Sequence, residues 1–106
     1  DKEAAKNAAL TALEKNPESF EANFGAGQIL TRAGASSEDV LPYYEKAASI
    51  EPSNSKVLRE LAGTYYDLGQ RERSLEVFEN AISNEDDKIV KADLYFNLGV
   101  IHSQMQ

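Results

Sequence analysis

The sequence of 106 residues predicts an all-α fold made of helices that pair as hairpins. The clearest pair lies between Val57 and Ile82, where two stretches carry apolar residues at helical spacing and a short turn separates them. The same pattern returns on both sides at intervals of 34 or 35 residues, as between Tyr44 and Phe78. Helical periodicity and a constant repeat length together predict hairpins repeated along the chain.

The central hairpin has one apolar face on each of its two helices. These faces consist of Leu58, Leu61, Ala62 and Tyr65 on the first helix, and Ser74, Phe78, Ala81 and Ile82 on the second. Gly69 lies in the turn between the helices, and we expect it to adopt the left-handed conformation that ends a helix, because glycine has no Cβ to oppose it. Neither helix buries its face alone, so we expect each to stabilise the other.

These residues resemble the tetratricopeptide repeat, whose 34 residues carry aromatic-x2-Leu-Gly-x2-Tyr, then Ala-x3-Phe and a final Pro. The central repeat matches with Leu in the aromatic slot, Ala in the Gly slot and Ser in the first Ala slot. The preceding repeat matches at Asn23, Ala26, Gly27, Leu30, Val40, Tyr44, Ala47 and Pro52, and the last at Tyr95, Leu98, Gly99 and His102. The resemblance implies a right-handed α-solenoid of helix-turn-helix hairpins.

The repeat length predicts one array over residues 1–106. We expect its parts to be the second helix of a preceding repeat over 1–16, complete repeats over 17–51 and 52–86, and the first helix of a further, incomplete repeat over 87–106.

Capping residues predict where the first helices begin. A helix is expected over residues 2–15, and Asn16 and Pro17 are expected to start the next one, over 18–33. Ser36 is expected to cap the helix that follows and that pairs with residues 18–33. A serine followed by an acidic first turn is typical of a helix start.

Two features depart from a regular period. Pro42 is expected in the first turn of its helix, where its missing amide is tolerated. Ala81 and Gly99 are separated by 18 residues, whereas the corresponding positions of the preceding repeat are separated by 15, so three residues are inserted. We expect either a longer loop or an extended start of the last helix, with Asp86 or Asp87 as its cap.

Composition excludes several classes of function. The chain has 18 acidic and 11 basic side chains, a net charge of −7, which disfavours nucleic acid because phosphate contacts need a concentrated basic surface. It has no cysteine, which excludes disulfides, thiol catalysis and cysteine-ligated zinc. No apolar run approaches the ~20 residues of a membrane span. The cellular compartment stays open.

Motifs for catalysis or for metal and cofactor binding are absent from the sequence: it has no glycine-rich phosphate loop, nucleophile elbow or metal-binding histidine pair. His102 occupies the slot where the family has a packing tyrosine, so we expect it to pack. The acidic run Glu85–Asp87 lacks the alternating ligands and the glycine of a calcium loop. We therefore expect no enzymatic activity, no metal and no cofactor.

The resemblance implies a binding surface, since the first helices of such repeats line a concave groove that holds an extended peptide or a partner helix. Helical phase assigns to this groove Glu21, Phe24, Gln28, Arg32, Lys56, Arg59, Glu60, Tyr66, Asp67, Asp93, Phe96, Asn97 and Val100. Phe24, Tyr66 and Phe96 recur at related positions, and exposed aromatic rings beside charges are typical of recognition surfaces. The alternative is that these rings pack against the facing second helices.

The main hypothesis is a non-catalytic protein–protein interaction scaffold with a protein or peptide partner. A second hypothesis is a self-assembly element, because the last helix carries Leu94, Leu98, Ile101 and Met105, a stripe expected to lack a partner helix and to self-associate. A third is a non-catalytic segment of a larger enzyme or of a secretion-machinery protein. The sequence names no partner.

Overall fold

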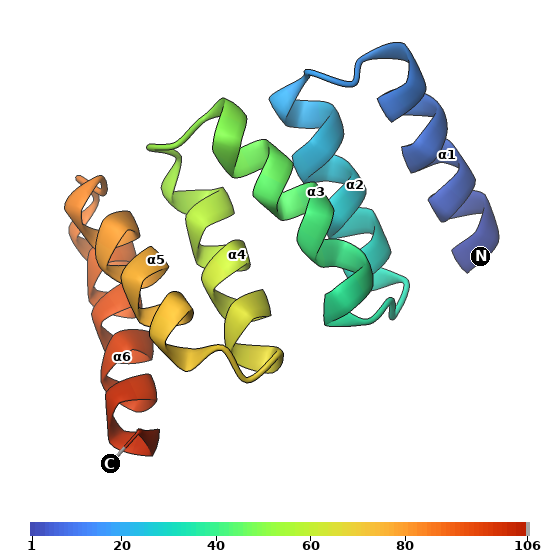
Figure 1. The fold of residues 1–106 in the computed structure, drawn as a ribbon. Coiled ribbons are helices and arrows are strands. Elements are labelled where there is room, and N and C mark those ends of the chain that lie inside the picture. Colours follow the sequence, from blue (N-terminus) through green and yellow to red (C-terminus); the bar gives the residue numbers. More distant parts are fainter. Residues whose placement is uncertain (106) are drawn as a thin grey trace. The chain divides into compact units, whose positions relative to one another are not determined.

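The structure, a computed structural model, describes residues 1–105, and these form six α-helices and no strand, so the predicted all-α fold is confirmed. The helices are α1 (Lys2–Lys15), α2 (Phe20–Arg32), α3 (Ser37–Ile50), α4 (Ser55–Asp67), α5 (Arg71–Ser83) and α6 (Lys88–Gln104) (Figure 1). They form two compact units, which meet in the sequence at Pro52 and Ser53. The first unit contains α1 to α3 and the second contains α4 to α6.

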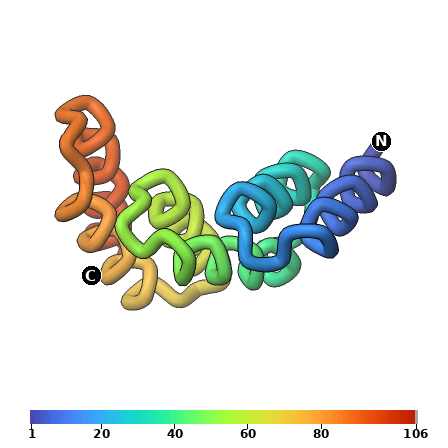
Figure 2. The backbone as a smooth tube through the Cα atoms, turned by 90° about the horizontal axis from the view of Figure 1, so that it is seen from above, coloured from blue at the N-terminus to red at the C-terminus, as the bar shows by residue number. Residues whose placement is uncertain are grey.

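In the second unit, α5 contacts both α4 and α6 (Figure 2). All eight residues predicted to form the two faces of the central hairpin are buried. Ser74, which takes the first Ala slot of the repeat, has a hydrogen-bond partner in this core. Its hydroxyl donates a hydrogen bond of 2.7 Å to the carbonyl oxygen of Ala62. The hairpin core is therefore as the periodicity predicts.

Both hairpins turn through the same backbone motif. Gly69 has a φ of 79° and Gly34 has a φ of 86°, so both glycines adopt the left-handed conformation expected at the end of a helix. After α4, the amide of Gln70 donates to the carbonyl oxygen of Tyr65 at 2.9 Å, and the amide of Gly69 donates to that of Tyr66 at 3.0 Å. The turn after α2 repeats both bonds. The carbonyls that end each first helix are thus satisfied within the turn.

In the first unit, α2 contacts both α1 and α3, and Gly27 of α2 lies directly against a side chain of α3. The ring of Tyr44 lies over this glycine so closely that a Cβ there would come within 2.6 Å of the Tyr44 Cε1 atom. The Tyr44 hydroxyl also lies 3.0 Å from the Thr31 hydroxyl, within hydrogen-bond distance. The Tyr44 side chain is therefore held both by its ring, against Gly27, and by its hydroxyl, next to Thr31.

The start of α2 differs from the prediction. Asn16 is the C-cap of α1, and α2 begins at Phe20 with Ser19 as its cap, the Ser19 hydroxyl accepting from the amide of Ala22 at 3.2 Å. The later start of α2 is explained by Asn23, a buried residue of this helix. Its side-chain amide donates hydrogen bonds to the carbonyl oxygens of Pro17 (3.1 Å) and Ser19 (2.8 Å). These two bonds hold residues 17–19 outside the helix.

The second correction concerns Pro42. Ser36 caps α3 as predicted, but the helix begins at Ser37, so Pro42 is its sixth residue and lies beyond the first turn. The helix still continues to Ile50. Pro42 is exposed, and on the exposed side of a helix water can satisfy a carbonyl group that loses its helical partner.

The three inserted residues extend the start of α6, which has 17 residues against 13 in α4. Asp87 caps the helix, its carboxylate accepting from the amides of Ile89 (2.8 Å) and Val90 (3.3 Å). The connection before it is held by Glu85, whose carboxylate accepts a hydrogen bond of 2.5 Å from the hydroxyl of Ser55 at the start of α4. This bond fixes the connection where no proline is present.

The prediction that the last helix exposes its apolar stripe is wrong. Leu94 and Ile101 are buried and Leu98 is half-buried, because this side of α6 packs within the unit, where α5 is the neighbour of α6; only Met105 of the predicted stripe is exposed. The prediction assumed that the neighbour would follow the helix in the sequence, whereas α5 precedes it. The apolar residues that α6 exposes lie on its other side.

Candidate functional site

In the second unit, predicted binding residues from two first helices come together. The guanidinium Nη1 of Arg59 on α4 lies 3.2 Å from the carboxylate Oδ2 of Asp93 on α6, and both side chains are about half exposed. An exposed pair of this kind contributes at most about 1 kcal/mol to stability, so it matters here because it brings two polar groups side by side. We call the surrounding residues the α4/α6 surface: Lys56, Arg59, Glu60, Tyr66, Asp67, Asp93, Phe96, Asn97 and Val100.

The α6 part of this surface includes two exposed apolar side chains. Phe96 has 70% of its surface exposed and Val100 has 39%, while Asn97 between them is half-buried. Burying an exposed phenyl ring against a partner lowers the free energy, because apolar surface is removed from water. Aromatic side chains are also enriched at protein interfaces. Phe96 is therefore the residue of this surface best suited to anchor a partner.

The α4 part of the surface is polar, with charges of opposite sign at its two ends. Lys56 is exposed near the start of the helix and Asp67 at its end, with Glu60 half-buried between them. Tyr66 is half-buried, and the guanidinium of Arg71 lies 5.1 Å from the centre of its ring, within the range of a cation–π contact. Such a surface can orient a bound segment by charge.

The four predicted residues of α2 belong to the first unit. Glu21 and Arg32 are exposed, and Gln28 and Phe24 are half-buried. The ring centre of Phe24 lies 5.4 Å from that of Phe20 and 6.0 Å from that of Tyr44 on α3, so Phe24 packs within its own hairpin. The alternative that these rings pack against a facing second helix therefore describes Phe24.

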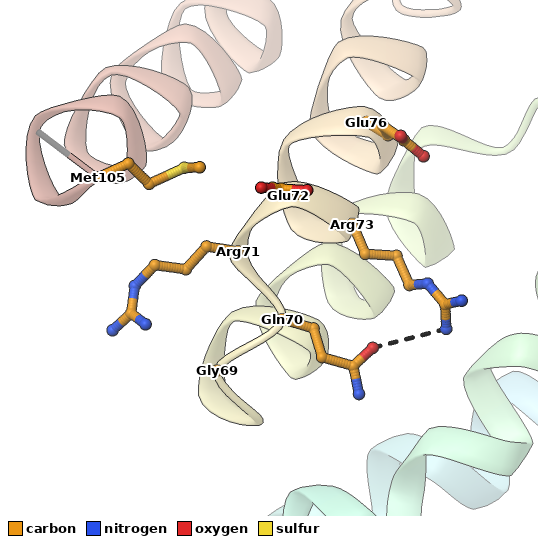
Figure 3. A pocket seen from close by; sticks show the side chains of 7 residues that line it. All are labelled: Gly69, Gln70, Arg71, Glu72, Arg73, Glu76 and Met105. Atoms are coloured by element: carbon orange, nitrogen blue, oxygen red, sulfur yellow. Dashed lines mark hydrogen bonds between the residues drawn. The ribbon is translucent and has the colours of Figure 1, made fainter.

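A cavity of about 590 Å³ lies at the turn between α4 and α5, at a place that the sequence did not indicate (Figure 3). Its lining residues are Gly69, Gln70, Arg71, Glu72, Arg73, Glu76 and Met105. Figure 3 shows that the side chains of Arg71 and Arg73 point apart, and Arg73 donates to the Gln70 side-chain oxygen at 3.5 Å. The two guanidinium groups therefore do not converge on one ligand.

Two structural features of residues 1–105 bear on other classes of function. No group of three or more histidine, aspartate or glutamate side chains in this part of the chain is placed to hold a metal ion. None of the helices described is both long enough and apolar enough to cross a membrane.

Paired helices of nearly constant length, joined by identical glycine turns, define an all-helical repeat protein. A family model described as tetratricopeptide repeat matches residues 1–55, and the chain belongs to this family. No curated protein matches the chain. Proteins with this repeat generally mediate protein–protein interactions and are typically non-catalytic, and no catalytic family was identified.

Proposed function

We propose that the chain is a non-catalytic scaffold that binds a peptide or a partner helix through the α4/α6 surface. The observation that carries this proposal is the exposure of Phe96 and Val100 next to the Arg59–Asp93 pair. This places apolar area and fixed hydrogen-bonding groups on the same face of one compact unit. Interfaces combine these two features, an apolar centre with polar groups around it.

Each part of the surface has a proposed role. Phe96 and Val100 receive an apolar side chain of the partner, and Arg59 and Asn97 bond to polar groups beside it. Lys56 and Asp67 set the direction of the bound segment, because their charges attract opposite ends of a polar peptide. In the first unit, taken by itself, we propose Glu21, Gln28 and Arg32 on α2 as partner contacts, with Phe24 supporting them from the hairpin.

Self-assembly is a second candidate function, favoured by a specific observation. Besides Phe96 and Val100, α6 exposes Ile89 and Tyr95, with 83% and 55% of their surfaces accessible. Several large apolar side chains exposed on one helix are typical of an interaction site. A second copy of the chain is one partner that could cover it.

Partner binding is tested by capture from a lysate of the source organism, followed by titration of the captured protein by isothermal calorimetry. We expect the double variant Phe96→Ala/Arg59→Ala to bind at least roughly tenfold more weakly, because truncating an aromatic anchor often costs about 2 kcal/mol or more. Circular dichroism should show unchanged helical content, since Phe96 is largely exposed and Arg59 is about half exposed.

The matched control is Glu76→Lys/Glu79→Lys, which changes two exposed residues of α5 away from the α4/α6 surface. It should bind the partner as the wild type does. If the control loses the partner and Phe96→Ala/Arg59→Ala retains it, recognition lies on the second helices and the proposal is wrong.

A further inference from the structure

One face of α4 is formed by residues that do not favour the helix that carries them. We call this face the α4 stripe and define it by Lys56, Glu60, Gly63 and Asp67. Helical phase places these four residues on one side of α4, opposite the buried side chains of the hairpin core. Lys56 and Asp67 are exposed, and Glu60 and Gly63 are half-buried. The stripe therefore reaches solvent from the first turn of α4 to its last residue.

The charges at the two ends of the stripe oppose the dipole of α4. Acidic side chains in the first turn and basic side chains in the last turn stabilise a helix. Among the six helices of residues 1–105, α4 alone has neither. Lys56 lies in its first turn instead, and Asp67 is its last residue. By contrast, α2 has the favourable order, with Glu21 in its first turn and Arg32 in its last.

Gly63, in the middle of the stripe, is a third residue that lowers the stability of α4. Glycine inside a helix is less favourable than alanine. No turn requires it here, because the glycines with a positive φ are Gly34 and Gly69. No close packing requires it either, since a Cβ on Gly63 would meet no atom within 4 Å. Residues that lower stability without an evident structural gain are typical of functional sites, and here three of them share one face.

We propose that the α4 stripe binds a partner helix that runs antiparallel to α4. The end charges that are unfavourable for α4 are favourable for such a helix, because Lys56 then lies beside the partner's last carbonyl groups and Asp67 beside its first amides. Lys56 and Asp67 are separated by roughly 16 Å at 1.5 Å per residue, so a partner helix of about three turns has both ends beside these charges. This inference rests on the proposed function and specifies the conformation and direction of the partner.

The stripe also specifies the side chains of the partner. The open space at Gly63 can take a large apolar side chain, as the backbone at Gly27 takes the ring of Tyr44. Glu60 and Asp67 lie on either side of this space and attract basic side chains, and Lys56 attracts an acidic one. From its amino end, the face of the partner that contacts α4 is therefore basic, apolar, basic and acidic. The net charge of −7 adds a general attraction for a basic segment.

Two synthetic peptides of the same composition test this pattern. The forward probe carries Lys, Leu, Lys and Glu, from its amino end, at the spacing of Asp67, Gly63, Glu60 and Lys56. The reversed probe carries the same four residues in the opposite order. Both are held helical by a lactam bridge on the far face, so that a difference in helicity does not affect binding. Fluorescence anisotropy at low salt should show at least roughly fivefold tighter binding of the forward probe, because the reversed probe places like charges together in the antiparallel arrangement.

Variants of the stripe assign this preference to its charges. Lys56→Gln/Glu60→Gln/Asp67→Asn removes the charges with little change of side-chain size, and it should reduce the preference to less than roughly twofold. The matched control Glu76→Gln/Glu79→Gln removes two carboxylates from the exposed side of α5 and should keep the preference of the wild type. Equal binding of the two probes by the wild type, or a full preference in the triple variant, would overturn the proposal.

The space at Gly63 is tested separately. Gly63→Leu should weaken binding of the forward probe at least roughly fivefold, because leucine fills the space that receives the apolar side chain. Leucine is a better helix former than glycine, so this variant should also unfold at a higher temperature, and weaker binding then does not reflect poor folding. Gly25→Leu fills an equally open position on α2 and should bind the forward probe as the wild type does. Normal binding by Gly63→Leu would contradict the proposal.

Failure of this inference can be told apart from failure of the proposed function. If the wild type does not distinguish the probes while Phe96→Ala/Arg59→Ala still loses the captured partner, the antiparallel helix is wrong and the proposed function stands. If that variant keeps the captured partner while the wild type prefers the forward probe, the proposed function is wrong and the α4 stripe is a binding face by itself.

Discussion

Replacing Phe78 with alanine is expected to lower the free energy of unfolding by about 3–5 kcal/mol. The ring is 4% exposed at the centre of the α4–α5 hairpin, among side chains that are themselves buried. Its removal loses the transfer free energy of a phenyl group and leaves a cavity that two helices fixed by a tight turn cannot close. Chemical denaturation followed by circular dichroism measures this loss.

Phe96→Ala is the matched control, since it makes the same chemical change on an exposed ring in the same unit. It should change stability by less than about 0.5 kcal/mol, the range usual for surface substitutions. If the two variants unfold at the same denaturant concentration, the packing described for α5 is wrong.

Replacing Gly27 with leucine is expected to have the second large effect, a loss of about 3 kcal/mol, at the upper end of the range for overpacking. A new Cβ would come within 2.6 Å of the Tyr44 ring. The ring cannot move aside cheaply, because it is 1% exposed and its hydroxyl is bound to Thr31.

Gly63→Leu makes the same change where a Cβ meets no atom within 4 Å. It should raise stability by up to about 1 kcal/mol, because leucine favours the helix more than glycine does. The two variants are thus expected to change the thermal midpoint in opposite directions. A decrease of similar size in both would contradict the close approach of α2 and α3.

The sequence predicts the hairpins well because both determinants of a hairpin are local. Apolar spacing identified the buried faces of α4 and α5, and Gly69 identified the turn between them. Local chemistry also narrowed the cap of α6 to Asp86 or Asp87, since an aspartate before a helix can accept from its free amides, and the structure has Asp87 in this role. The division into repeats at residues 16, 51 and 86 stays a prediction.

The errors have a different origin, which is interactions that apolar spacing and capping preferences do not include. Asn16 and Pro17 were predicted to start α2, but the helix starts later, because the side-chain amide of Asn23 bonds to the carbonyl oxygens of Pro17 and Ser19. Which side of α6 is exposed depends on which helix covers the other side. Helical phase alone does not show whether that helix precedes or follows α6 in the sequence.

The candidate site was predicted in part for the same reason. Helical phase placed Arg59 and Phe96 correctly on exposed faces, but it could not show that Phe24 reaches the ring of Tyr44 on another helix. The cavity at the α4–α5 turn needs Met105 close to residues 69–76, and no local signal relates these positions.

The insertion before α6 has a consequence for how this chain can evolve. The four-residue connections before α4 and α6 are equal in length, so the added residues lengthen the helix and not the loop. Relative to the repeat pattern, α6 begins four residues earlier than α4. Four residues make one full helical turn plus only about 40° of further rotation. New residues therefore add surface, including Ile89, while the buried side keeps its phase. Lengthening by whole turns allows such a protein to acquire new contacts without redesigning its core.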